Sequence, residues 1–330
     1  MDLLLGLVLI FSLIFVANAT EAQGSARLKR IFNWILLLVN LPIFLLGLTL
    51  LLVSPEQLEA TQLDLAFSAY RPAGLVLLVS AVWGLLVTLP EVRRLFARWL
   101  PLNPGSAVHA LALVLAGYLV GNSVVSLTQG GLEGLAQTSS AATIFDVVAS
   151  ELLYATVGLA GVGIFIRREG WKLLDRIGLQ VPTGAQLRRS LRWVFLLVAL
   201  QWLAGALFLL TDPQQAEALE NLNTLLLGNM DTVGEWFLLA VSAAIGEEIL
   251  FRGAIQPVFG LWATSLLFAL AHIQYGFTIA TVLVFGIGVA LGLIRQRYNT
   301  SIAIFVHFSY NFLLGLLALL APYLERLATG

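Results

Sequence analysis

The stretch EWFLLAVSAAIGEEILFR (residues 235–252) decides the fold of this chain. It is apolar over a length that suits a membrane helix, yet it carries Glu247, Glu248 and Arg252 near its end. A charged side chain at membrane depth costs at least about 2.5–3.5 kcal/mol, and such residues are retained mainly where a function uses them. This stretch therefore predicts both a membrane-embedded fold and a functional site.

The composition supports the same class. Hydrophobic residues make up 59% of the 330 residues, charged residues only 11%, and the mean hydropathy is +0.92. We predict an all-α fold, a polytopic transmembrane helical bundle of about ten spans with an intramembrane cavity. The net charge of −1 gives no sign of a nucleic-acid partner, and the lack of cysteine excludes disulfides and thiolate catalysis. The expected spans are 3–19, 31–53, 73–89, 106–127, 146–166, 193–211, 235–252, 258–274, 277–294 and 301–320.

Basic residues predict the orientation. Sixteen of the 18 Lys and Arg residues fall on one set of alternating loops, and only Arg71 and Arg326 fall on the other. Because Lys and Arg concentrate in cytoplasmic loops, both termini are expected outside the cytoplasm and the site toward the cytoplasmic side. The sequence predicts a multi-pass protein of a prokaryotic plasma membrane or of an organelle membrane of bacterial descent.

Two segments call for a separate interpretation. The first span ends in Ala17-Asn18-Ala19, which resembles a signal-peptidase site, but it has no basic region before it, so we expect an uncleaved helix. The basic loop between the fifth and sixth spans, residues 167–193, is expected to lie along anionic lipid headgroups. Glycines at 286, 288 and 292 predict close helix packing.

Helix geometry gives the first pair in the site. Residues four positions apart share one face, so Glu248 can pair with Arg252 while Glu247 points about 100° away. The small residues before Glu247 are expected to leave room beside it for water or a substrate backbone; they are Ser242, Ala243, Ala244 and Gly246.

Two further polar clusters follow along the chain. His272 ends the sequence FALAH, and His307 and Asn311 share a face in HFSYN. At about 1.5 Å per residue, Glu247 and His307 lie at similar depths, roughly 8 and 10 Å from the cytoplasmic ends of their helices. His272 reaches the same cavity only if a break at Pro257 or Gly260 makes its helix start near Leu261.

These residue types suit hydrolysis by water. A buried carboxylate can act as a general base, and a neutral histidine can position the attacking water. A histidine and an asparagine on one face can donate hydrogen bonds to an oxyanion. No serine, cysteine or threonine within the motifs stands where a nucleophile would be required.

Together the motifs resemble one family. E-E-x-x-x-R begins at Glu247, F-x-x-x-H joins Phe268 to His272, and H-x-x-x-N joins His307 to Asn311. In this order, on successive membrane helices, they are similar to the CPBP family, which joins type II CAAX prenyl proteases to bacteriocin-processing and Abi proteins. The resemblance is clearest over 230–320. It predicts a protease domain over 101–330 that follows N-terminal helices of unassigned role over 1–100.

The resemblance implies a role for each motif residue. Glu247 and His272 would activate water, His307 and Asn311 would form the oxyanion hole, and the remaining two, Glu248 and Arg252, would support the site. The chain is then expected to be a glutamic intramembrane endopeptidase that acts on a membrane-associated peptide or protein within the lipid bilayer, without a cofactor.

Two alternatives remain open at this point. Glu247, His272 and His307 could instead hold zinc, which binds two histidines and a glutamate with a fourth position open. Members of the family have been described both as metalloproteases and as glutamate proteases. A protein of another class, a membrane scaffold, an immunity-type binding protein or a proton-coupled transporter, would also place Glu and His inside a membrane.

Overall fold

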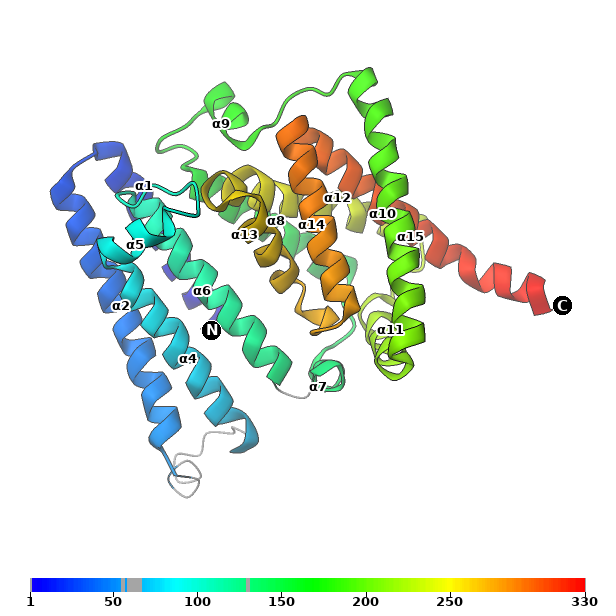
Figure 1. Ribbon diagram of the computed structural model, residues 1–330, viewed down its shortest axis with the longest axis horizontal. Helices are drawn as coiled ribbons and strands as arrows, with labels where there is room; N and C mark the ends of the chain where they lie inside the picture. Colours follow the sequence, from blue (N-terminus) through cyan, green and yellow to red (C-terminus); the bar gives the residue numbers. More distant parts are fainter. Residues whose placement is uncertain (1, 55–56, 58–66, 129–130, 330) are drawn as a thin grey trace. The chain divides into compact units, whose positions relative to one another are not determined.

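The computed structural model describes residues 2–54, 57, 67–128 and 131–329. These residues form helices and no β-strand, apart from an isolated bridge between Ile164 and Arg168. The helices group into two compact units, Met1–Gly131 and Leu132–Gly330 (Figure 1). The structure thus confirms the predicted all-α polytopic fold. The protease domain proposed over 101–330 stays a prediction.

The first unit is a set of long apolar helices with one short helix. Its elements are α1 (Asp2–Gln23), α2 (Ala26–Leu52), α4 (Phe67–Val87), α5 (Pro90–Phe96) and α6 (Ala107–Thr128). The backbones of α2 and α4 approach closely because Gly47 faces the backbone of Leu78, leaving no room for a Cβ atom. Buried Asn40 donates to the Leu36 carbonyl at 2.7 Å and accepts from the Tyr118 hydroxyl at 2.9 Å, so its amide is satisfied inside the apolar unit.

The second unit carries every predicted site residue. Its elements are α7 (Gly131–Thr138), α8 (Ile144–Val162), α9 (Gly170–Ile177), α10 (Gly184–Thr211), α11 (Pro213–Leu227), α12 (Val233–Glu247), the π-helix η1 (Glu248–Ile255), α13 (Gln256–Ala271), the 3-10 helix η2 (Ile273–Tyr275), α14 (Ile279–Arg297) and α15 (Thr300–Thr329). Apolar residues of α10, α14 and α15 form a buried core that includes Leu197, Leu291, Ile294, Ile302 and Val306.

Nine helical stretches in the described part of the chain are long and apolar enough to cross a membrane. One of them, Val233–Ala271, has 39 residues, which at 1.5 Å per residue is about 58 Å, or roughly twice the hydrocarbon thickness. It covers the expected span 235–252 and most of the expected span 258–274, which accounts for the difference from ten. The protein is a multi-pass integral membrane protein.

Gly260 interrupts this long stretch. Its backbone lies at φ 73° and ψ −178°, a conformation that only glycine adopts readily, so the helical run restarts near Leu261 as predicted. Pro257 instead lies in the first turn of α13, where it is tolerated. The kink lets His272 end a helix that turns back toward Glu247.

The predicted glycine packing on α14 is correct at two positions and wrong at the third. A Cβ atom on Gly288 would lie 3.2 Å from Ser265, and one on Gly292 would lie 2.4 Å from Leu261. These glycines let α13 and α14 approach closely. Gly286 has nothing within 4 Å of the Cβ position and faces open space.

Candidate active site

The chain changes helix type at the centre of the site. A capping box between Thr232 and Glu235 starts α12, and α12 ends at Glu247. The next residue, Glu248, begins a π-helix that extends to Ile255. Nothing in the residue spacing indicated this change. Turns of π-helix are rare and occur frequently at functional sites, because they alter the direction of side chains within an otherwise regular helix.

Glu248 and Arg252 form a buried ion pair, as the four-residue spacing predicts. Arg252 Nε lies 3.2 Å from Glu248 Oε2, and neither side chain is more than 1% exposed. Arg252 also donates from Nη2 to the Gly288 carbonyl at 3.2 Å, and its guanidinium lies 4.4 Å from the Phe268 ring centroid. Arg252 was counted among the basic residues of the cytoplasmic loops, and that assignment is wrong because the residue is enclosed by helices.

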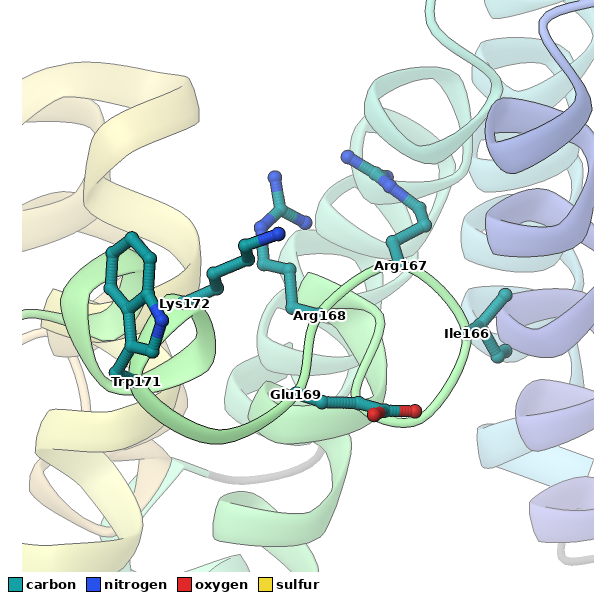
Figure 2. A pocket seen from close by; sticks show the side chains of 6 residues that line it. All are labelled: Ile166, Arg167, Arg168, Glu169, Trp171 and Lys172. Carbon is teal, nitrogen blue, oxygen red and sulfur yellow. The ribbon is translucent and has the colours of Figure 1, made fainter.

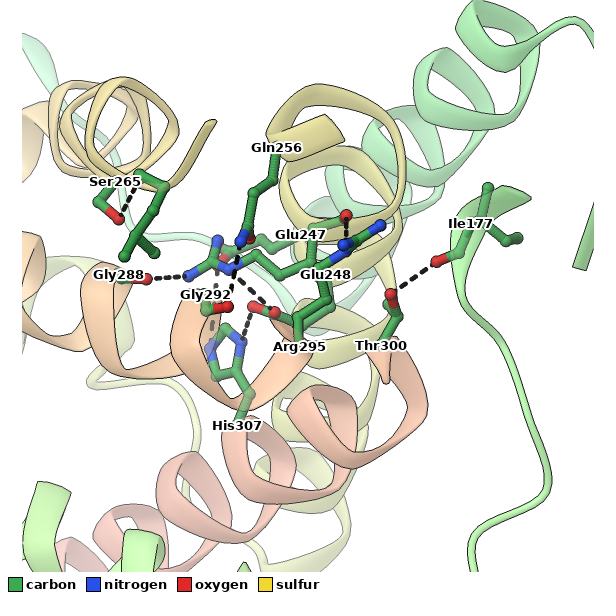
Figure 3. A network of polar contacts seen from close by, with 12 residues as sticks. Ile177, Glu247, Glu248, Gln256, Ser265, Gly288, Gly292, Arg295, Thr300 and His307 are labelled. Atoms are coloured by element: carbon green, nitrogen blue, oxygen red, sulfur yellow. Dashed lines mark hydrogen bonds and ion pairs between the residues drawn. The ribbon is translucent and has the colours of Figure 1, made fainter. Parts of the chain in front are cut away.

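The carboxylate of Glu247 faces both histidines of the motifs. His272 Nε2 lies 3.5 Å from Glu247 Oε1, and His307 Nε2 lies 3.8 Å from Glu247 Oε2. Glu247 Oε2 is buried and makes no hydrogen bond with the described residues. Figure 3 shows His307 of α15 between the two glutamates, with Nδ1 3.0 Å from Glu248 Oε1.

The hydrogen bonds on the opposite ring nitrogens assign the histidine tautomers. His272 Nδ1 lies 2.8 Å from the Phe268 carbonyl oxygen, which only accepts, so Nδ1 carries the proton. His307 Nδ1 likewise donates to Glu248, whose carboxylate is paired with Arg252. Each neutral ring therefore presents an Nε2 lone pair toward Glu247. Three acceptors that face one another favour a proton or another cation between them.

Phe268 links the parts of the site physically. Its carbonyl orients His272, and its ring centroid lies 4.6 Å from the His272 ring and 6.3 Å from the His307 ring. The same ring lies under the Arg252 guanidinium. The first residue of F-x-x-x-H thus does more than fill apolar space, because it holds one histidine and covers the buried ion pair.

Arginine side chains bind the carbonyls at the end of the π-helix. Arg295 Nε donates to the Arg252 carbonyl at 2.8 Å. Arg176 of α9 donates to the Gly253 carbonyl at 2.7 Å and to that of Ala254 at 3.5 Å. In the sequence, Arg176 and Arg295 were only basic residues beside a span. Nothing in their spacing indicated that they brace the site.

The segment after α9 also holds the start of α15. Thr300 donates from its hydroxyl to the Ile177 carbonyl at 2.6 Å (Figure 3), and its amide donates to the Gly178 carbonyl at 2.9 Å. The Gln180 amide donates to the Ser301 hydroxyl at 2.9 Å. The segment that makes these contacts is RIGLQ, residues 176–180. It ties the helix of Glu248 to the helix of His307.

Glu151 of α8 is a neighbour of the site that the sequence motifs did not indicate. Its side chain is buried against Gly246, beside Glu247. Glu151 and Glu247 interact electrostatically. The small residues before Glu247 were expected to leave room for water or substrate. At Gly246 that expectation is wrong, because α8 fills the space with the backbone and carboxyl group of Glu151.

This contact predicts a large effect of one methyl group. A Cβ atom on Gly246 would lie 2.4 Å from the Glu151 carbonyl oxygen, which is backbone and cannot swing aside. We expect Gly246→Ala to lower the free energy of unfolding by about 1–3 kcal/mol, the usual cost of overpacking. Gly286→Ala, with open space at the Cβ position, is the matched control and should be neutral or slightly stabilising. Thermal unfolding in detergent compares the two, and equal stability of both variants would contradict the close contact.

The exposed fraction of the site's side chains decreases from His272 to Glu247 and His307. The His272 side chain is 18% exposed, that of Glu247 8% and that of His307 5%. Tyr275 stacks on the His272 ring, with the two ring centroids 6.1 Å apart. Asn311 lies one turn beyond His307 on α15, half-buried, and the described residues give it no hydrogen bond. Its amide is thus available to another group, whereas its role in an oxyanion hole stays a prediction.

The histidine and glutamate side chains of the site are also of the kinds that bind metal ions. Imidazole nitrogen and carboxylate oxygen are common zinc ligands, and Glu248 on His307 Nδ1 is the kind of outer contact that orients a metal-binding histidine. As the side chains stand, no group of three His, Asp, Glu or Cys residues in the described ranges could hold a metal ion. The donor chemistry fits zinc, and binding would require the side chains to move together.

The part of the chain that carries the site is similar to a known protein family. Residues 229–313 match the model of a family described as type II CAAX prenyl endopeptidase, Rce1-like. No curated protein and no solved structure matches the chain. The match includes all three motifs and confirms the family resemblance that they indicated.

Proposed function

From the match of residues 229–313 to the Rce1-like type II CAAX prenyl endopeptidases, we propose that this protein is an intramembrane endopeptidase of the glutamic type. The observation that carries this proposal is the carboxylate of Glu247 with an imidazole Nε2 on either side, at 3.5 and 3.8 Å. A carboxylate in this position can remove a proton from a water molecule, and the neighbouring Nε2 atoms can orient that water.

The proposed reaction is direct attack of water on a peptide carbonyl. Glu247 takes one proton as the water oxygen bonds to the carbonyl carbon, and His272 holds the water through its Nε2 lone pair. The carbonyl oxygen then carries the negative charge. As the C–N bond breaks, the proton held by Glu247 passes to the leaving amine, which leaves a carboxylic acid product and regenerates the base.

His307 and Asn311 are proposed to stabilise the oxyanion. Because Nδ1 of His307 is committed to Glu248, its Nε2 can donate only when the ring carries a second proton. In that form the ring would lie against the carboxylates of Glu248 and Glu247. The amide of Asn311, one turn away, would supply the second donor.

The proposed substrate is a membrane-associated peptide or protein. The family description points to a prenylated C-terminal sequence, and a prenyl chain would lie in the lipid that surrounds the apolar helices. Entry is proposed from the cytoplasmic side or laterally from lipid, in the plasma membrane of a prokaryote or an organelle membrane of bacterial descent.

The direct test is cleavage of a prenylated CAAX peptide by the purified protein, with products identified by mass spectrometry. We expect His272→Ala and His307→Ala each to lose most activity, because each removes a ring nitrogen that faces Glu247. His109→Ala is the matched control, since His109 lies in the first unit and accepts from the Asn103 amide. Unchanged cleavage by both site variants would overturn the proposal.

A zinc-dependent reaction is the second candidate, favoured by the two Nε2 lone pairs directed at Glu247. Glu247, His272 and His307 would hold the ion, which would supply a Lewis acid and lower the pKa of a bound water. For the metal-free reaction we expect a strong zinc chelator to leave the cleavage rate unchanged. Loss of activity on chelation, with recovery on added zinc and with zinc bound to the protein by elemental analysis, would establish the metalloprotease instead.

A further inference from the structure

The loop after α8 lies where a membrane helix reaches the headgroups. The candidate span ends at Val162, so the residues that follow leave the hydrocarbon. Two aromatic side chains there are turned outward, Phe165 at 80% exposed and Trp171 at 72%. Aromatic residues at this level of a membrane protein commonly anchor it in the interface between lipid and water.

A tight, strained turn presents the first of these aromatic rings. The Gly163 carbonyl accepts from the amides of Arg167 at 2.9 Å and Arg168 at 3.0 Å. Phe165 within this turn has φ 62°, the left-handed region that a non-glycine residue rarely adopts. Residues held in such conformations concentrate at functional sites. Here the strained turn keeps an apolar ring exposed instead of folding it inward.

Three cationic side chains line a pocket beside these rings. The pocket is lined by Ile166, Arg167, Arg168, Glu169, Trp171 and Lys172. Figure 2 shows the charged ends of Arg167, Arg168 and Lys172 on one side of the loop, whereas the Glu169 carboxylate points away from them. Arg168 also donates to the Val162 carbonyl, so the last turn of α8 holds its guanidinium in place.

The arginine side chains around this pocket repel one another. Burial lowers the pKa of Arg176, which falls to about 10. Repulsion from Arg168, Arg295 and Arg167 adds to the decrease. The pKa of Arg168 is also lowered, first by burial and then by Arg167. An anion in the pocket would relieve this repulsion.

We propose that this pocket, formed by Arg167, Arg168 and Lys172, binds the phosphate of an anionic phospholipid headgroup, with Phe165 and Trp171 inserted among the surrounding lipids. Charge complementarity selects the ligand, since juxtamembrane basic residues attract anionic lipids. The position at the end of a span selects the bilayer over a soluble anion. A phosphate between two guanidinium groups and an ammonium would receive charge-assisted hydrogen bonds.

The C-terminal end of the same short helix connects the pocket to the catalytic helices. Arg176 binds the end of the π-helix, and the Ile177 and Gly178 carbonyls accept from Thr300 at the start of α15. A lipid that fixes α9 would therefore steady the helices of Glu248 and His307. This consequence rests on the proposed protease function, whereas the lipid site itself does not.

The test measures retention of phosphatidylglycerol by the full-length protein in nanodiscs that contain phosphatidylcholine with or without it. Arg167→Gln/Lys172→Gln leaves the structural contact of Arg168 intact. Each charge-assisted hydrogen bond from the pocket to the phosphate is expected to contribute about tenfold or more, so this variant should bind phosphatidylglycerol roughly 100-fold more weakly. Arg188→Gln/Arg189→Gln removes the same charge from exposed positions at the start of α10, outside the pocket, and should lose only the general attraction to an anionic surface, about fivefold per residue.

Four results would overturn the lipid site. Equal losses in both double variants would mean diffuse attraction without a pocket, and no loss in either would mean no binding there. Displacement of phosphatidylglycerol by inorganic phosphate at low concentration would mean that the pocket takes a soluble anion. The charge-preserving variant Arg167→Lys/Lys172→Arg should retain binding, and its failure would contradict a site selected by charge.

Proteolysis measured in the same nanodiscs separates the two proposals. We expect phosphatidylglycerol to raise the cleavage rate of the native protein and to leave that of Arg167→Gln/Lys172→Gln unchanged. Lipid binding without cleavage in any lipid would refute the protease and leave the lipid site standing. Cleavage that does not respond to these substitutions, with binding unchanged, would refute the lipid site and leave the protease standing.

Discussion

Replacement of Glu247 by glutamine is expected to reduce the rate of peptide cleavage by about 10²–10⁴-fold, the usual contribution of a general base. Glutamine keeps the shape of the side chain but cannot take a proton from water. It also removes the negative charge that faces both Nε2 atoms, at 3.5 Å for His272 and 3.8 Å for His307. Initial rates with a prenylated CAAX peptide, measured at several substrate concentrations, give the loss in kcat.

Folding and substrate binding need separate controls in this experiment. Glu235→Gln is the matched substitution, because Glu235 lies on the same helix, caps its exposed start, and can be replaced by glutamine in a capping box. We expect full activity from it. Glu247→Gln should unfold at a temperature close to that of the native protein, since the side chain volume is conserved. Cleavage at a native rate by Glu247→Gln would exclude Glu247 as the base.

Replacement of Arg252 by methionine is expected to lower the free energy of unfolding by about 3–5 kcal/mol, because it leaves Glu248 buried without its ionic partner. Arg252 is fully buried and also holds the Gly288 carbonyl and the face of Phe268. Reversible unfolding in mixed micelles with dodecyl sulfate measures the change.

A second substitution separates the lost charge pair from lost packing. In Glu248→Gln/Arg252→Met no buried charge is left alone, so most of the stability should return. Arg188→Met, at an exposed position, should change stability by less than about 0.5 kcal/mol. If the double variant is as unstable as Arg252→Met alone, packing of Arg252 would account for its role and the ion pair would not.

The sequence predicted those features that follow from local spacing. The four-residue interval between Glu248 and Arg252 predicted their ion pair, and the structure forms it. Gly260 was expected to end one helical run and start another, and its left-handed backbone does so. Both predictions rest on helix geometry and on glycine conformation, which act over a single turn.

Features that depend on packing between distant segments were not predictable. Nothing around Glu151 shows that its helix packs against Gly246, 95 positions later. Arg295 resembled the other arginines at a helix end, yet it binds the Arg252 carbonyl. The π-helix was also missed, because its residues have ordinary helical propensities and tertiary contacts stabilise its free carbonyls.

The glycine pattern on α14 predicted the packing of this helix only in part. Three glycines within seven residues predicted a packing surface, but only Gly288 and Gly292 face α13. Gly286 lies two residues before Gly288, about 200° around the helix, and so faces elsewhere. The helical period alone could have shown that Gly286 lies on a different face of α14 from Gly288 and Gly292.

The decrease in exposure from His272 to Glu247 and then to the fully buried Glu248 and Arg252 has a consequence for turnover. In a protease with this geometry, the catalytic centre would be open to the outside only on the side of His272, with the buried Glu248 and Arg252 behind it. A polypeptide could not pass through it, so both fragments would have to leave by the mouth through which the substrate entered. Such an enzyme would make a single cut in each encounter and would release its products before cutting again, in contrast to a processive protease that draws a chain through a pore.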